Sequence, residues 1–198
     1  MKYNDWTLGQ VEAVFNKLGG DDGVRRFLSG ELVVKPVDRN WSTWKTIRLG
    51  TNGLKTADDF RKFLKDNGFS IGDYANDILG KPTFTAAAEE IELDLVVASV
   101  AELGFKNGAT REQIYARAKE LGLDLCPAEV GPQLRLQYKD QPNGEWLIVA
   151  MEPIAGSVGG LELFGVERYD SDLWLDGCYG GPDYVWDSDD RFVFSRRK

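Results

Sequence analysis

The hydrophobic pattern of this chain changes its period partway along the sequence, and this change limits the possible folds. Up to about residue 80, apolar residues recur at three- and four-residue spacing, as at Val11, Val14, Phe15 and Leu18. Over 90–100, apolar and polar residues alternate instead. A period of 3.6 gives a helix one buried face, whereas a period of two does so for a strand. The pattern therefore predicts an α+β fold, with a helical first part and an antiparallel sheet in the second.

Capping and turn residues divide the first 80 residues into short elements. Thr7 and Gly19 are typical of the two ends of a helix over 8–18, and a shorter helix follows, capped by Asp21 or Asp22. An extended piece over 31–34 and a strand over 40–50 come next. Two more helices are expected between Thr56 and Gly80. We expect residues 1–80 to form a mostly helical N-terminal domain.

The second half predicts strands around one helix. A strand over 90–100 precedes a helix over 110–121, and residues 134–138 alternate before a turn over 139–144. This pattern predicts a β-hairpin whose return strand covers 146–150. Further strands are expected over 161–166, 173–175 and 192–194. We place the domain boundary at 80–88 and expect an α+β domain over 88–198.

The sequence contains no histidine, which removes the commonest general base and the commonest metal ligand. Carboxylates at the predicted domain junction could still perform acid–base chemistry in a hydrolase or transferase: Glu89, Glu90, Glu92 and Asp94. Their spacing is more typical of a solvated strand face. We therefore expect a protein that is not an enzyme and uses no cofactor.

The N-terminus has no apolar segment typical of a signal peptide, and no apolar run approaches the length of a membrane span. The two cysteines, Cys126 and Cys178, form no metal-binding motif. These features predict a cytoplasmic protein without a membrane partner.

The net charge of −8 disfavours nucleic acid as a partner. An alternative function is still open, that of a nucleic-acid-associated regulator. Arg25 and Arg26 of the 1–80 helices could form its basic patch, or the 110–138 unit could be the DNA element. In the second case the helix over 110–121, after the strand over 90–100 and before a hairpin, forms a winged helix with Arg111, Arg117 and Lys119 facing DNA.

The segment 169–191 interleaves aromatic residues with Asp, Gly and Ser. Between Leu161 and Asp190 there are nine acidic residues and one basic residue. Tyr and Trp give large contact areas at low entropic cost, so the composition favours a binding surface; a solvated loop above buried tryptophans is the alternative. A calcium loop is excluded because Trp174 occupies a ligand position, and we expect no metal site. A looser acidic cluster at Asp187, Asp189 and Asp190 stays open.

Two segments carry a resemblance to a known family. Residues 5–28, from Asp5-Trp6-Thr7-Leu8-Gly9 to Phe27-Leu28, resemble a leader found on many uncharacterised proteins of small bacteria, whose C-terminal parts differ. Residues 173–194, with Leu173-Trp174-Leu175 and Phe192-Val193-Phe194, resemble the variable region of diversity-generating retroelement target proteins. The resemblance implies a C-type lectin-like scaffold that displays hypermutated residues to a ligand.

Mutagenesis in such systems is directed to template adenines, so an Asn codon is changed into codons for Asp, Tyr, Ser, Gly and Cys, among others. Eight positions carry these residue types: Asp176, Gly177, Cys178, Tyr179, Asp183, Tyr184, Asp187 and Ser188. The resemblance implies that they contact a protein or another macromolecular ligand, and that they project into solvent between fixed apolar residues.

Overall fold

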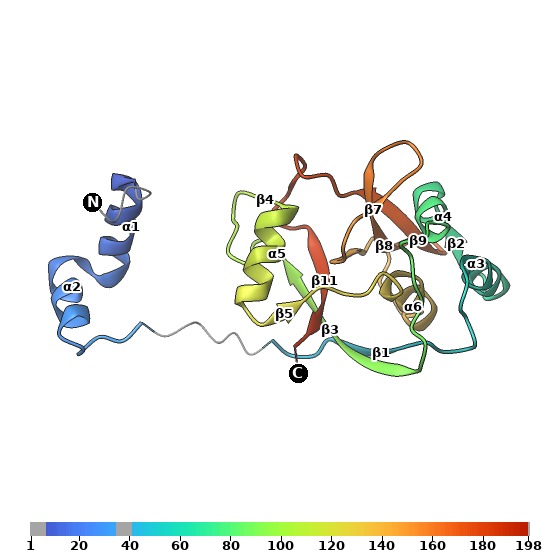
Figure 1. The fold of residues 1–198 in the computed structure, drawn as a ribbon, viewed down its shortest axis with the longest axis horizontal. Coiled ribbons are helices and arrows are strands. Elements are labelled where there is room, and N and C mark those ends of the chain that lie inside the picture. The colour runs from blue at the N-terminus through green and yellow to red at the C-terminus, as the bar shows by residue number, and fades with distance from the viewer. Residues whose placement is uncertain (1–6, 35–40, 198) are drawn as a thin grey trace. The chain divides into compact units, whose positions relative to one another are not determined.

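A computed structural model describes residues 7–34 and 41–197 (Figure 1). The chain divides into two compact units, Met1–Asp38 and Arg39–Lys198, which are described separately. Strand β1 (Lys45–Leu49) pairs with β3 (Ile91–Ser99) in the second unit. The boundary expected at 80–88 thus falls inside one sheet, because residues on both sides of it pair with each other.

The first unit is a helical hairpin of α1 (Leu8–Leu18) and α2 (Gly20–Leu28). Thr7 forms a capping box at the start of α1, and Gly19 ends it with a φ of 95°. The two predicted helices are confirmed, although α2 begins directly at Gly20. Residues 31–34 form no strand. Asp5 and Trp6 of the leader lie outside the described residues.

The second unit is built on a mixed sheet in the order β1, β3, β11, β6, β8, β9, β2. Strand β11, at the C-terminal end, lies antiparallel to β3 and parallel to β6. The short β2 is also parallel to its neighbour β9. Besides β1 and β3, the strands of this sheet are β11 (Arg191–Arg196), β6 (Trp146–Val149), β8 (Leu161–Tyr169), β9 (Asp172–Tyr179) and β2 (Ser70–Ile71). The prediction of an antiparallel sheet is therefore only partly right.

Smaller strands extend this framework. Two of them join the large sheet at its margins, β5 (Leu123–Asp124) on β11 and β7 (Ile154–Ala155) on β8. Two others form a separate antiparallel pair, β4 (Ala109–Thr110) with β10 (Val185–Trp186). The separate pair matters for the candidate site because it holds the segment that precedes β11.

Four helices of the second unit lie within the described residues: α3 (Ala57–Asp66), α4 (Asp73–Leu79), α5 (Arg111–Glu120) and α6 (Val130–Gln137). Helices α4 and α6 pack against β8 and β9, and α3 packs against α6 (Figure 1). Phe84 lies between Phe60 of α3 and Phe164 of β8, with ring centroids 5.5 and 6.0 Å away. The chain is thus α+β, as the sequence predicted.

Helix α6 replaces the strand predicted over 134–138, so that prediction is wrong. Every residue from Val130 to Leu136 is buried. Polar Gln133 and Arg135 are enclosed together with the apolar residues of this helix, so the alternation of polar and apolar residues does not mark a strand with one solvent-exposed face. The turn at 139–144 consequently joins a helix to β6 and does not close a β-hairpin.

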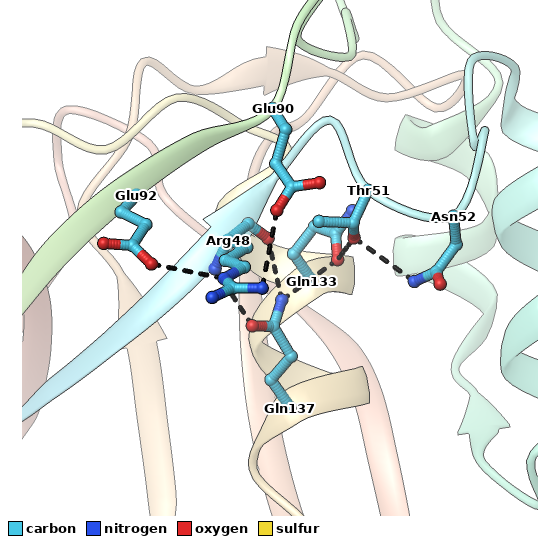
Figure 2. A network of polar contacts seen from close by, with 7 residues as sticks. All are labelled: Arg48, Thr51, Asn52, Glu90, Glu92, Gln133 and Gln137. Atoms are coloured by element: carbon cyan, nitrogen blue, oxygen red, sulfur yellow. Dashed lines mark hydrogen bonds and ion pairs between the residues drawn. The ribbon is translucent and has the colours of Figure 1, made fainter.

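Polar residues of α6 bind β1 and the turn that follows it: in Figure 2, Gln137 contacts Arg48 of β1 and Gln133 contacts Thr51. The Gln137 side chain accepts from the Arg48 amide (2.9 Å) and donates to the Arg48 carbonyl (2.8 Å). About two turns earlier, at the N-cap of α6, buried Glu129 accepts from the amides of Gly50 (2.8 Å) and Ala87 (2.6 Å). The edge strand therefore pairs with side chains, which keeps it from pairing with another chain there.

Arg135, also on α6, is fully buried without a carboxylate partner among the described residues. Its guanidinium donates to Gln141 Oε1 (2.5 Å) and to the Glu167 carbonyl (3.1 Å), and it lies over the Phe69 ring. Burial lowers the pKa of Arg135 to about 10. The residue fastens the 139–144 turn to the sheet.

Candidate functional site

Two tyrosines project from the end of β9 and the segment after it. Tyr179 is 44% exposed and Tyr184 is 45% exposed, whereas the neighbouring Trp186 is only 4% exposed. Their rings form an edge-to-face series, with centroids 6.2 Å apart for Tyr179 and Tyr184 and 4.8 Å apart for Tyr184 and Trp186. Trp186 in turn contacts Phe192 of β11 at 5.1 Å. The exposed tyrosines thus rest on a buried aromatic base.

The segment carrying these rings is fixed at several points. The Tyr179 hydroxyl donates to Asp183 Oδ1 (2.9 Å), and this hydrogen bond is the main cause that raises the pKa of Tyr179. Arg111 of α5 donates to the Gly180 carbonyl (2.8 Å). The amide of Ala101 donates to the Ser188 carbonyl (2.8 Å). A surface held in this way loses little entropy when it binds a ligand.

Four acidic residues gather along the same segment. Asp183, Asp187 and Asp189 are exposed, and none of the ion pairs between described residues involves them. Asp190 is half-buried, and its pKa is raised by burial and further by the charges of Asp187 and Asp189. This part of the surface therefore carries uncompensated negative charge.

A hollow of about 570 Å³ adjoins the turn at 187–190. It lies between that turn and the segment 142–146, and Asn143, Trp146 and Asp189 contribute to its lining. Glu145 and Arg191, also in the lining, form an ion pair at 2.7 Å. Sequence reasoning missed 142–146 as part of the site, because only the parallel pairing of β6 with β11 brings the two segments together.

The structure divides the eight predicted contact positions into two groups. Tyr179, Asp183, Tyr184 and Asp187 are exposed, whereas Asp176, Gly177, Cys178 and Ser188 are half-buried.

The half-buried positions 176–178 belong to β9 and not to a loop. A Cβ at Gly177 would lie 2.7 Å from Tyr74 Cβ of α4. The Cys178 thiol donates to the Leu163 carbonyl (3.8 Å), and burial raises its pKa. The expectation of an exposed Cys178 is corrected accordingly, because β8 and α4 enclose this end of the strand.

The other candidate groups have structural partners. Glu90 and Glu92 both pair with Arg48 (3.6 and 3.2 Å; Figure 2), and Asp94 accepts from the Thr46 hydroxyl (2.5 Å). Arg117 pairs with Glu120 at 2.7 Å. The winged-helix interpretation required a strand at 134–138, which is α6.

Within the described part of the chain, no group of three or more Cys, Asp or Glu side chains is arranged to hold a metal ion. None of the helices in that part is long and apolar enough to cross a membrane.

No protein-family model, no curated protein and no solved structure matches this chain.

Proposed function

We propose that the second unit binds a macromolecular ligand, most simply a protein with a basic surface, through a tyrosine and aspartate patch. The patch consists of Tyr179, Asp183, Tyr184 and Asp187. The observation that carries the proposal is the pair of half-exposed tyrosines, in which Tyr179 packs against Tyr184 and Tyr184 packs against the buried Trp186. Tyrosines that are rigid and exposed are typical anchors of binding surfaces.

The charge of the patch supports a basic partner. Its two aspartates have no cationic neighbour at ion-pair distance among the described residues, so a Lys or Arg of a ligand could pair with them. The Asp183 carboxylate is already oriented by the Tyr179 hydroxyl. The hollow beside Asp189 would extend the contact area toward Trp146.

We further propose that the patch is the displayed region of a diversity-generating retroelement target protein on a C-type lectin-like scaffold. The residue types at the four exposed positions support this, because Tyr and Asp are among the residues that an Asn codon yields when its template adenines are mutated. Variation would then concentrate at the four exposed positions, because side chains at 176–178 face protein neighbours.

Selection from random peptides displayed on phage tests the binding proposal, with the full chain immobilised. Selected peptides should be rich in Lys and Arg and should bind the double variant Tyr179→Ala, Tyr184→Ala at least about tenfold more weakly. Tyr169→Ala is the matched control. Tyr169 is also exposed, but it lies at one end of β8, whereas Tyr179 pairs with Glu162 at the other end. Peptides that bind all three proteins equally would contradict the proposed patch.

A further inference from the structure

A second hollow, of about 450 Å³, lies at the edge of the large sheet where β2 is the last strand. Helices α3 and α4 border it together with β2 and β9, and these elements lie side by side in Figure 1. Its lining includes Arg61, Lys65, Phe69, Ser70, Asn76 and Trp174. Trp174 and Tyr179 are five residues apart on β9, roughly 16 Å along an extended strand, and no residue of the tyrosine and aspartate patch lines this hollow. The second hollow is therefore a separate candidate site.

The cationic side chains of α3 point to an anionic ligand. Arg61 is positioned by hydrogen bonds from Nε to Asn76 Oδ1 (2.7 Å), from Nη2 to the Asn76 carbonyl (2.7 Å) and from Nη1 to Asp58 Oδ1 (2.8 Å). A guanidinium carries five N–H groups, so two of those of Arg61 stay available to a ligand. Lys65 follows one turn later on the same face of the helix, and its ammonium forms no ion pair or hydrogen bond with any described residue.

A third cation lies behind the aromatic part of the lining. Phe69 is buried, and the Arg135 guanidinium carbon lies 5.4 Å from the centre of its ring. Arg135 also donates to the Trp174 carbonyl (3.5 Å), and no carboxylate of a described residue pairs with it.

The positive charge here contrasts with the rest of the second unit. The three cations outnumber Asp58, which pairs with Arg61, and Asp73, the acidic residue among the described residues of the lining. Residues 1–38 contain six acidic and five basic residues, which leaves 26 acidic and 19 basic residues in 39–198. A local excess of positive charge on a unit with a net charge of −7 favours an anion at this hollow.

The other lining residues narrow the chemistry of that anion. A phosphate monoester presents three acceptor oxygens, so it can accept from Arg61, Lys65 and the Ser70 hydroxyl together. Trp174 is half-buried and offers part of its ring to the hollow, where a flat ring of a ligand can stack on it. The volume is within the range of about 300–1,000 Å³ that is usual for small-molecule sites, whereas inorganic phosphate would fill only a small part of it.

We propose that the second hollow binds a small phosphate monoester that carries a flat ring, of the size of a nucleoside monophosphate. Arg61 and Lys65 hold the phosphate, and Trp174 stacks on the ring. This inference does not depend on the macromolecular ligand proposed above, because the two sites share no residue.

Isothermal titration calorimetry of the full chain with AMP and with UMP tests the proposal. At least one of the two nucleotides should bind with a Kd below about 1 mM. Its nucleoside and inorganic phosphate, titrated separately, should each bind at least about tenfold more weakly, because each lacks one half of the recognised chemistry. Failure of both nucleotides to bind, or equal affinity for a nucleotide and its nucleoside or for a nucleotide and inorganic phosphate, would overturn the proposal.

Variants of two lysines on α3 place the ligand. Lys65→Gln should weaken nucleotide binding at least about tenfold and leave nucleoside binding unchanged, since it removes a charge-assisted contact to the phosphate. The variant should keep the wild-type melting temperature, because Lys65 has no partner among the described residues. Lys62→Gln is the matched control: Lys62 is exposed on the same helix, pairs with Asp66 and does not line the second hollow, so nucleotide binding should be unchanged.

Trp174→Leu tests the ring contact and should weaken the binding of the nucleotide and of its nucleoside alike. Wild-type nucleotide affinity in Lys65→Gln would place the ligand elsewhere on the protein and reject the proposed site.

Discussion

Tyr184 stands edge-on against Trp186, with ring centroids 4.8 Å apart, so an exposed ring is held by a buried one. The two residues should therefore differ in their effect on stability. Tyr184→Ala should lower the free energy of unfolding by about 1–2 kcal/mol, because it removes the edge contacts of an exposed ring with Tyr179 and Trp186. Trp186→Ala should lower it by about 3–5 kcal/mol, because it leaves a cavity. Urea denaturation of both variants measures the difference, and equal losses would contradict the view of Trp186 as the base of the patch.

Replacement by Ser at two of the predicted variable positions should distinguish a position packed within the scaffold from a position on the exposed surface. Gly177→Ser should destabilise the protein by about 1–3 kcal/mol, because its Cβ would lie 2.7 Å from Tyr74 Cβ. Asp187→Ser, at an exposed position, should change stability by less than about 0.5 kcal/mol. Thermal unfolding of the two variants is the measurement. A neutral Gly177→Ser would mean that α4 tolerates side chains at this position.

The cysteines should react slowly with a thiol reagent in the native state, because burial raises the pKa of Cys126 and of Cys178. Both should react fully when the chain is unfolded in urea. Asp187→Cys supplies an exposed thiol on the same surface as a positive control. Rapid reaction of one thiol in the native wild-type protein, lost in Cys178→Ser, would show that β9 leaves this residue accessible.

Glu129 accepts hydrogen bonds from the amides of Gly50 and Ala87 at a buried position. Glu129→Ala should therefore destabilise the protein by about 3 kcal/mol, since both donors lose their partner. Gln137→Ala should cost about 1 kcal/mol, because its partners at Arg48 can reach water. Chemical denaturation compares the two variants. A smaller loss for Glu129→Ala than for Gln137→Ala would contradict the assignment.

Asp77 should contribute to stability in acid. Its carboxylate accepts from the Ser157 hydroxyl and amide (both 2.6 Å) and pairs with Lys81, which lowers its pKa from 3.8 to about 2. A lowered pKa stabilises the folded state above pH 3.8, and this contribution is lost as the pH falls from about 3.8 to about 2. Asp77→Asn should therefore be less stable than wild type at pH 7 and should lose less stability over that pH range.

Circular dichroism during acid titration measures this difference. Exposed Glu152→Gln is the control and should follow the wild-type curve. Superimposable curves for wild type and Asp77→Asn would mean that the Ser157 contacts do not persist in solution.

Local sequence signals predicted a large part of the fold. Thr7, Thr56 and Thr110 each form the capping box that begins α1, α3 and α5. The alternation predicted over 90–100 corresponds to β3. These elements could be predicted because caps, turns and amphipathic periods act within a few residues. The predicted strands follow one another at short intervals, which favours antiparallel pairing of neighbours. The sequence therefore did not indicate that β6 and β11 pair in parallel.

Two features of the candidate site illustrate the limit of local signals. The residue types at 176–188 all fit a displayed surface, yet only contacts with α4 and β8 distinguish half-buried Gly177 and Cys178 from exposed Tyr179. Likewise, nothing near Asp189 in the sequence points to the segment 142–146 across the hollow. Burial and adjacency of this kind arise between segments far apart in the chain.

By itself, the sequence determined the α+β class, the caps of the main helices and the aromatic, acidic character of the C-terminal segment. Only the tertiary structure decided that 130–137 is a helix, that one sheet crosses the expected domain boundary, and which aromatic residues remain exposed. The physical reason is that a period in the sequence records one partly exposed face. A segment enclosed on every side, such as α6, has no such face, and its conformation is set by its neighbours in space.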